Sequence, residues 1–296
     1  GQSLIGAAAG IYWPTAELAV PYLCNPVKTS KAFALVRSAE ALGIFLGVFS
    51  GSILNTLIYF KSNFINDILC MIMIIYLIGR NKIVITKALN NYQINDSKEI
   101  LASEKRWHKN TKFIVPSIIL ITTCLALIQV TLPLDFVKGG VFRDSISKSM
   151  TSYIISVQLI LLFILQWPIG NWLSLKGRLF GLKFSLINFG ISALLLCISS
   201  FFGKIGIFIM LLGMIFCSIG ISSFLPSSSD IVYRIAPSNK KGFGLALLSQ
   251  CFALGYFTGP LISGRILDFY GNASIIWIVI SLLCFFTTIV LLDKKY

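Results

Sequence analysis

The sequence contains little charge, almost no histidine and no strand-like patterning. Asp, Glu, Lys and Arg make up only 12% of the 296 residues, whereas hydrophobic residues make up 56%. A water-soluble domain carries about twice that share of charge, so this composition excludes an ordinary soluble protein. Alternation of apolar and polar residues at strand spacing is absent. Because a bilayer admits only helices or closed barrels, we predict an all-α polytopic membrane protein.

Residues suited to metal binding or catalysis are also scarce. His108 is the only histidine, and no Cys or carboxylate lies near it at metal-ligand spacing. The seven cysteines form no Cys-x-x-Cys motif, and we interpret them as small apolar residues of the interior. We therefore predict no metal, no cofactor and no catalytic site. A membrane-embedded enzyme acting on a lipid-linked substrate is the less favoured alternative.

The hydrophobic residues gather in nine runs, each long enough to cross about 30 Å of hydrocarbon as a helix. The runs lie near residues 3–23, 32–58, 63–79, 113–134, 151–173, 181–202, 205–226, 243–266 and 273–292. We expect nine transmembrane helices.

The basic residues lie mostly on one side of these runs. When the connections are assigned alternately to two sides, one side holds 19 Lys and Arg and the other holds six. The positive-inside rule then places residue 1 outside and the C-terminus in the cytoplasm, and we expect a bacterial plasma (inner) membrane. We interpret the net charge of +14 as a topology signal and predict no nucleic-acid partner.

The polar stretch between the third and fourth runs divides the chain. We predict that residues 1–80 form three helices of an N-terminal bundle and that residues 113–296 form a C-terminal six-helix bundle. Residues 81–112 are interpreted as a solvated cytoplasmic linker. The alternative is an amphipathic helix lying on the membrane with Trp107 at the interface.

An internal repeat links the two parts. The heptapeptide Ala41–Gly47 returns as Ala253–Gly259, with five of seven letters identical at an offset of 212 residues, and the same offset places Pro14 on Pro226. Two related helical halves in a membrane are typical of a transporter. Because the offset carries the run 113–134 to negative positions, we expect three further helices ahead of residue 1.

Both copies of the repeat contain small residues spaced four apart, which lie on one helix face and allow close backbone approach. We interpret these faces as moving gate contacts, with static helix packing as the alternative. The residues are Gly43, Gly47 and Gly51 in the first copy, and Gly255, Gly259, Pro260 and Gly264 in the second.

Charged residues inside apolar runs are costly, so each indicates a role. Glu40 lies about ten residues past the cytoplasmic turn, or about 15 Å deep. It is our first proton-coupling candidate and Glu17 the second, although a structural pair of Glu40 with Arg37 explains its position equally well. Asp230 and Arg234, at i and i+4, predict an ion pair near a gate. Two acids near the outer helix ends, where water is available, receive little weight: Asp67 and Asp135.

The segment that ends the fifth run resembles the cytoplasmic loop motif Gly-x-x-x-Asp-Arg-x-Gly-Arg-Arg of the major facilitator superfamily, through Gly170, Gly177 and Arg178. The Asp and the first and last Arg of the motif are replaced here by Ser174, Leu175 and Leu179. The segment Gly255 to Gly264 is similar to an antiporter signature of the same family, Gly-x-x-x-Gly-Pro-x-x-Gly-Gly, which the family carries in its fifth helix.

The resemblance implies a two-bundle fold in which this chain supplies helices four to twelve of twelve. It also implies that the first, fourth and seventh runs line a central cavity. The candidate lining residues are Tyr12, Trp13, Gln129, Ser222 and Ser223. Such a mostly apolar lining with scattered polar groups suits a small amphipathic solute.

We therefore predict a secondary active transporter that resembles drug and metabolite efflux permeases and works by alternating access. We expect proton-coupled export by a monomer, with the solute, protons and membrane lipid as its partners. A fragment of such a carrier that cannot transport is the alternative.

Overall fold

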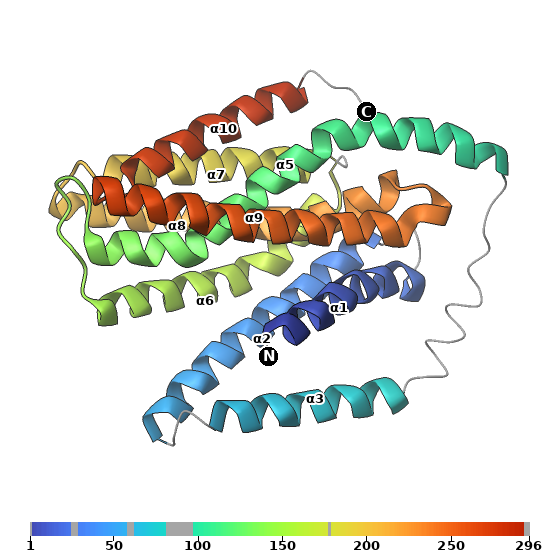
Figure 1. The fold of residues 1–296 in the computed structure, drawn as a ribbon, viewed down its shortest axis with the longest axis horizontal. Coiled ribbons are helices and arrows are strands. Elements are labelled where there is room, and N and C mark those ends of the chain that lie inside the picture. The colour runs from blue at the N-terminus through green and yellow to red at the C-terminus, as the bar shows by residue number, and fades with distance from the viewer. Residues whose placement is uncertain (1, 25–28, 58–61, 81–96, 177–178, 293–296) are drawn as a thin grey trace.

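The computed structural model describes residues 2–24, 29–57, 62–80, 97–176 and 179–292 (Figure 1). Within these residues the chain forms nine α-helices, a 3₁₀ turn η2 (Ser238–Lys240) and no strand. The all-α prediction is confirmed. The helices are α1 Gln2–Leu23, α2 Thr29–Leu57, α3 Ser62–Arg80, α5 Ser97–Lys138, α6 Lys148–Leu173, α7 Phe180–Ser199, α8 Lys204–Ile235, α9 Lys241–Tyr270 and α10 Ser274–Leu292.

Six helices of the described chain, α5 to α10, contain stretches long and apolar enough to cross a membrane. They correspond to the last six of the nine predicted runs. In α3, the stretch Ile68–Leu77 is apolar but shorter. The α1 and α2 helices form where the runs predict them but do not meet the same measure.

The α5 helix is longer than its apolar run predicts. It begins at Ser97, so residues 97–112, which we expected to belong to a solvated cytoplasmic linker, are helical. Trp107 is only 5% exposed and belongs to the hydrophobic core, so the helix packs on the bundle at this residue. The rest of the predicted linker, residues 81–96, lies outside the described residues.

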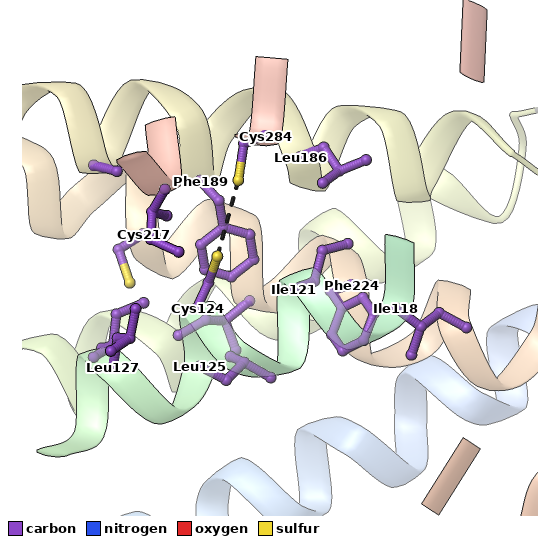
Figure 2. Close-up of a cluster of buried hydrophobic side chains, with 14 of the residues drawn as sticks. Ile118, Ile121, Cys124, Leu125, Leu127, Leu186, Phe189, Cys217, Phe224 and Cys284 are labelled. Atoms are coloured by element: carbon purple, nitrogen blue, oxygen red, sulfur yellow. Dashed lines mark hydrogen bonds between the residues drawn. The ribbon is translucent and has the colours of Figure 1, made fainter. Parts of the chain in front are cut away.

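The C-terminal half, α5 to α10, surrounds the main hydrophobic core. The α7 helix packs between α8 and α10, and α5 packs on α9. Figure 2 shows Phe189 of α7 and Phe224 of α8 facing α5, with the Cys124 and Cys284 sulfurs 3.9 Å apart between α5 and α10. Cys124, Cys197, Cys217, Cys251 and Cys284 are all buried, as the apolar interpretation predicts, whereas Cys70 is exposed.

The N-terminal half, α1 to α3, lies along one side of this bundle (Figure 1). The two halves meet where α2 packs on α6 and α8, and where α1 packs on α9. We call the end of the bundle that contains Thr29, Leu173, Ile235 and Lys241 the Thr29 end. The opposite end, where α6 begins at Lys148, is the Lys148 end.

Candidate functional site

A cavity of about 590 Å³ lies between the two halves. Its walls come from α1 and α2 on one side and from α5, α6, α8 and α9 on the other, and most of the lining residues are apolar. The polar lining residues are Glu17, Arg37, Glu40, Gln129, Gln158, Ser249 and Tyr256. The cavity can therefore hold a largely apolar molecule and present charge at one place in its wall.

That charge belongs to a cluster of four side chains on three helices, three of them charged, which we call the Arg37 cluster. Arg37 of α2 is 6% exposed, and its Nη1 donates to Glu40 Oε2 at 2.7 Å. Its Nη2 donates to Glu17 Oε1 of α1 and to Ser229 Oγ of α8, the latter at 3.2 Å. Ser229 Oγ also donates to Glu17 Oε1 at 3.1 Å. With both carboxylates ionised, the cluster holds one arginine charge against two acidic charges, a formal net charge of −1.

Both interpretations of Glu40 have a geometric basis in this cluster. The ion pair with Arg37 that its i+3 spacing suggested is present, and Glu40 also lines the cavity with its side chain 26% exposed. Glu17 is less accessible, at 9% exposure of the side chain. A proton arriving from the cavity can reach Glu40 more easily than Glu17.

The internal repeat explains the place of Ser229. Glu17 and Ser229 are 212 residues apart, which is the repeat offset, and they bond to each other across the boundary between the halves. The same offset places Arg37 on Ser249, which lines the opposite wall. The two walls are thus related by the repeat, but the charges come from the N-terminal half alone. We did not predict Ser229, although adding the offset to Glu17 identifies it.

A second polar contact joins the halves at the Thr29 end. Arg234 Nε donates to Asp230 Oδ1 at 2.8 Å, so the ion pair that the spacing indicated is present. Thr29 Oγ1 of α2 donates to the same oxygen at 2.9 Å and accepts from Arg234 Nη2 at 2.6 Å. Thr29 was not among our candidates. This contact and the Arg37 cluster hold the halves together at this end, beside the cavity.

The glycine faces differ between the two copies of the repeat. A Cβ built on Gly255 would lie 2.7 Å from backbone atoms of Thr122 and Thr123, and one on Gly259 would lie 3.3 Å from Ala126 Cβ. These glycines therefore permit the close packing of α9 on α5.

Among the described residues, no tight contact is seen at three other glycines, and their role as gate contacts stays a prediction. A Cβ on Gly43, Gly47 or Gly264 would meet no atom within 4 Å. Gly51 lies outside the residues whose surroundings are described, and the role of Pro260 stays a prediction.

Two of the five predicted lining residues, Trp13 and Gln129, line the cavity. The other three predicted residues are not among the residues that line it. Tyr12 is 56% exposed on the outer surface, whereas Ser222 and Ser223 are fully buried within the C-terminal half. Helical spacing groups residues on a face but does not identify the neighbour of that face. Gln158 and Tyr256 line the cavity without having been predicted, because polar residues within long apolar helices carry no local signal of direction.

Asp135 is not hydrated, contrary to our expectation. It is fully buried at the Lys148 end, 3.2 Å from Arg143, and its Oδ2 accepts from Trp277 Nε1 at 3.1 Å. Arg143 Nη1 also donates to Ser199 Oγ at 2.6 Å. This network ties the turn after α5 to α7 and α10, which indicates a structural role. The side chain of Asp67 lies outside the described residues.

Of the three motif residues Gly170, Gly177 and Arg178, the structure describes only the first. Gly170 is buried, and its position allows close approach to α2, because a Cβ there would lie 2.6 Å from Ala34 Cβ. Gly177 and Arg178 lie outside the described residues. Of the three motif residues, Gly170 alone lies in a described contact between the halves.

Comparison with known proteins identifies the fold. The family model of the Major Facilitator Superfamily matches residues 114–295, more than half of the chain. The chain belongs to the Major Facilitator Superfamily. Together with the six long apolar helices, this makes it an integral membrane protein. The family that the loop motif and the repeat suggested is confirmed.

Individual members of the superfamily are more distant. Multidrug resistance protein MdtG of Escherichia coli is 26% identical over 192 residues, which are 64% of this chain and 46% of MdtG. The chain thus matches about half the length of these curated relatives. The fucose:proton symporter FucP of E. coli shares the fold, with a TM-score of 0.67 at 15% identity over 96% of this chain and 73% of FucP. FucP in an outward conformation gives a TM-score of 0.65 at 14% identity, with the same shares covered.

Proposed function

We propose that this protein is a secondary active transporter that moves a small amphipathic solute through the cavity between its halves by alternating access. We further propose that it works as a monomer in a bacterial inner membrane and exports its solute in exchange for protons. The observation that carries this proposal is the 590 Å³ cavity with the Arg37 cluster in its wall. The names of the relatives, a multidrug resistance protein and a proton symporter, favour the same class of activity.

The cluster supports proton coupling by its charge balance. Two carboxylates share one guanidinium in a mostly apolar cavity, so one acidic charge is not neutralised. An uncompensated charge away from water is costly, and either a proton or a cationic solute removes that cost. Competition between the two at Glu40 would exchange protons for solute. A lipophilic monocation is accordingly the solute class that the cavity suits best.

The exchange is tested with Glu40→Gln, which imitates the protonated acid. Purified protein in proteoliposomes is supplied with tetraphenylphosphonium, a lipophilic monocation, with and without a pH gradient. We expect the rate of gradient-driven transport to fall about tenfold or more in the variant. A tenfold fall corresponds to the loss of a coupling interaction of roughly 1.4 kcal/mol. Exchange of labelled for unlabelled probe without a gradient should persist.

Asp268→Asn is the matched control, because Asp268 is 82% exposed and pairs with Lys138 outside the cavity. It should transport as the wild type does. Gradient-driven transport that survives in Glu40→Gln would remove Glu40 from the coupling step and leave Glu17 to be tested. Absence of transport in the wild-type protein would favour the alternative of an incompetent fragment.

The proposed orientation predicts which positions an impermeant thiol reagent can reach. Ser149 is exposed at the Lys148 end, and Leu175 is 78% exposed at the Thr29 end. In a background without the seven native cysteines, we expect Ser149→Cys to react in intact cells and Leu175→Cys to react only after permeabilisation. The opposite pattern would reverse the topology.

A further inference from the structure

The corner where α6 turns into α7 carries a group of aromatic rings that the cavity does not use. The Trp172 ring lies 5.5 Å from Phe180 and 5.4 Å from Phe184, centroid to centroid, and the two phenylalanines stack 5.9 Å apart. The Lys176 ammonium lies 5.5 Å from the centre of the Trp172 ring. We call these four residues the α6–α7 corner.

This corner faces outward at the Thr29 end. Trp172 is 40% exposed, Phe180 is 39% exposed, and neither lines the cavity. The corner lies where two helices of membrane-spanning length end and begin, which places it at the boundary between hydrocarbon and water. Aromatic rings gather at this depth because their apolar faces enter the lipid while their polar edges meet the headgroups.

The positive charge of the corner has no acidic partner in the described chain. Lys176 is exposed, Lys183 follows one turn into α7, and neither takes part in an ion pair among the described residues. The loop motif that this segment resembles carries an Asp at the position that Ser174 occupies here, so that acid is absent from this chain. The local charge is therefore open to an external anion.

We propose that the α6–α7 corner is a binding site for the headgroup of an anionic phospholipid. Trp172 and the two phenylalanines contact the upper part of the acyl chains, and Lys176 binds the phosphate, with Lys183 adding to the local potential. This site does not depend on the proposed transport activity. Because each basic residue near a lipid surface contributes about fivefold in affinity for anionic over neutral lipid, removing the Lys176 charge should lower the preference about fivefold.

Quenching of Trp172 fluorescence by brominated lipid tests the site. The protein is reconstituted with either dibrominated phosphatidylglycerol or dibrominated phosphatidylcholine, and the Trp172 signal is the difference between wild type and Trp172→Phe. We expect phosphatidylglycerol to be preferred about fivefold in the wild type. Lys176→Gln should bring the ratio close to one, whereas Lys176→Arg should keep most of it.

The matched control is Lys204→Gln, since Lys204 is exposed at the start of α8 at the opposite end. It should leave the ratio at Trp172 unchanged. Equal quenching by both lipids in the wild type would overturn the proposal. So would a ratio that stays at its wild-type value in Lys176→Gln, or that falls as far in Lys204→Gln.

Discussion

Arg37→Gln is expected to destabilise the protein by about 3–5 kcal/mol and to abolish transport, because removal of one member of a buried ion cluster leaves its partners unpaired. Arg37 holds together Glu17 of α1, Glu40 of α2 and Ser229 of α8, across the boundary between the halves. Glutamine cannot neutralise either carboxylate or reach three acceptors at once. Thermal unfolding of the purified protein in detergent, followed by circular dichroism, measures the loss.

The matched control for Arg37 is an ion pair at the surface. Lys138 is 39% exposed and lies 3.4 Å from Asp268, so Lys138→Gln should cost less than about 1 kcal/mol. A variant with Gln at positions 17, 37 and 40 carries no unpaired charge and should recover much of the stability, but not the gradient-driven transport. If Arg37→Gln unfolds at the same temperature as Lys138→Gln, the cluster does not hold the halves together.

Gly255→Leu is expected to abolish transport and to destabilise the protein by about 1–3 kcal/mol or more, the usual cost of inserting bulk into a packed contact. A Cβ at Gly255 would lie 2.4 Å from Thr122 Oγ1 and 2.7 Å from the Thr122 carbonyl carbon. The obstacle includes backbone, which cannot move aside without separating α9 from α5. Unfolding in detergent and transport in proteoliposomes are measured on the same preparation.

The internal repeat supplies the control for this variant. Gly43 occupies the equivalent position in the first copy, yet a Cβ there meets no atom within 4 Å. Gly43→Leu should therefore unfold as the wild type does and keep its stability in detergent. Replacing Gly by Leu raises helix propensity to a similar extent at both positions, so propensity cannot explain a loss. Equal loss of stability in both variants would therefore show that the loss does not come from the α5–α9 contact.

The class of fold could be predicted from the sequence because its signals are local. A long apolar run predicts a membrane-spanning helix from its own residues alone. Six of the runs form the long apolar helices α5 to α10. The repeat needed only a comparison of the chain with itself. The Asp230–Arg234 pair followed from i, i+4 spacing on one helix, and its formation needed no knowledge of the neighbouring helices.

Longer-range features were decided by the tertiary structure. Helical spacing placed Gly43 and Gly255 on equivalent faces, but only the position of α5 made one face packed and left the other open. The position of Asp135 near a helix end suggested that water would reach it, but in the structure Arg143 and Trp277 enclose its carboxylate.

For the same reason, the sequence by itself determined a helical membrane protein that contains an internal repeat. The tertiary structure decided that Arg37 bonds to Ser229, and that Trp13 faces the cavity while Ser222 faces away from it. A helix determines which of its own residues share a face through its 3.6-residue period. What that face meets depends on residues hundreds of positions away, whose placement is set by the packing of the whole bundle.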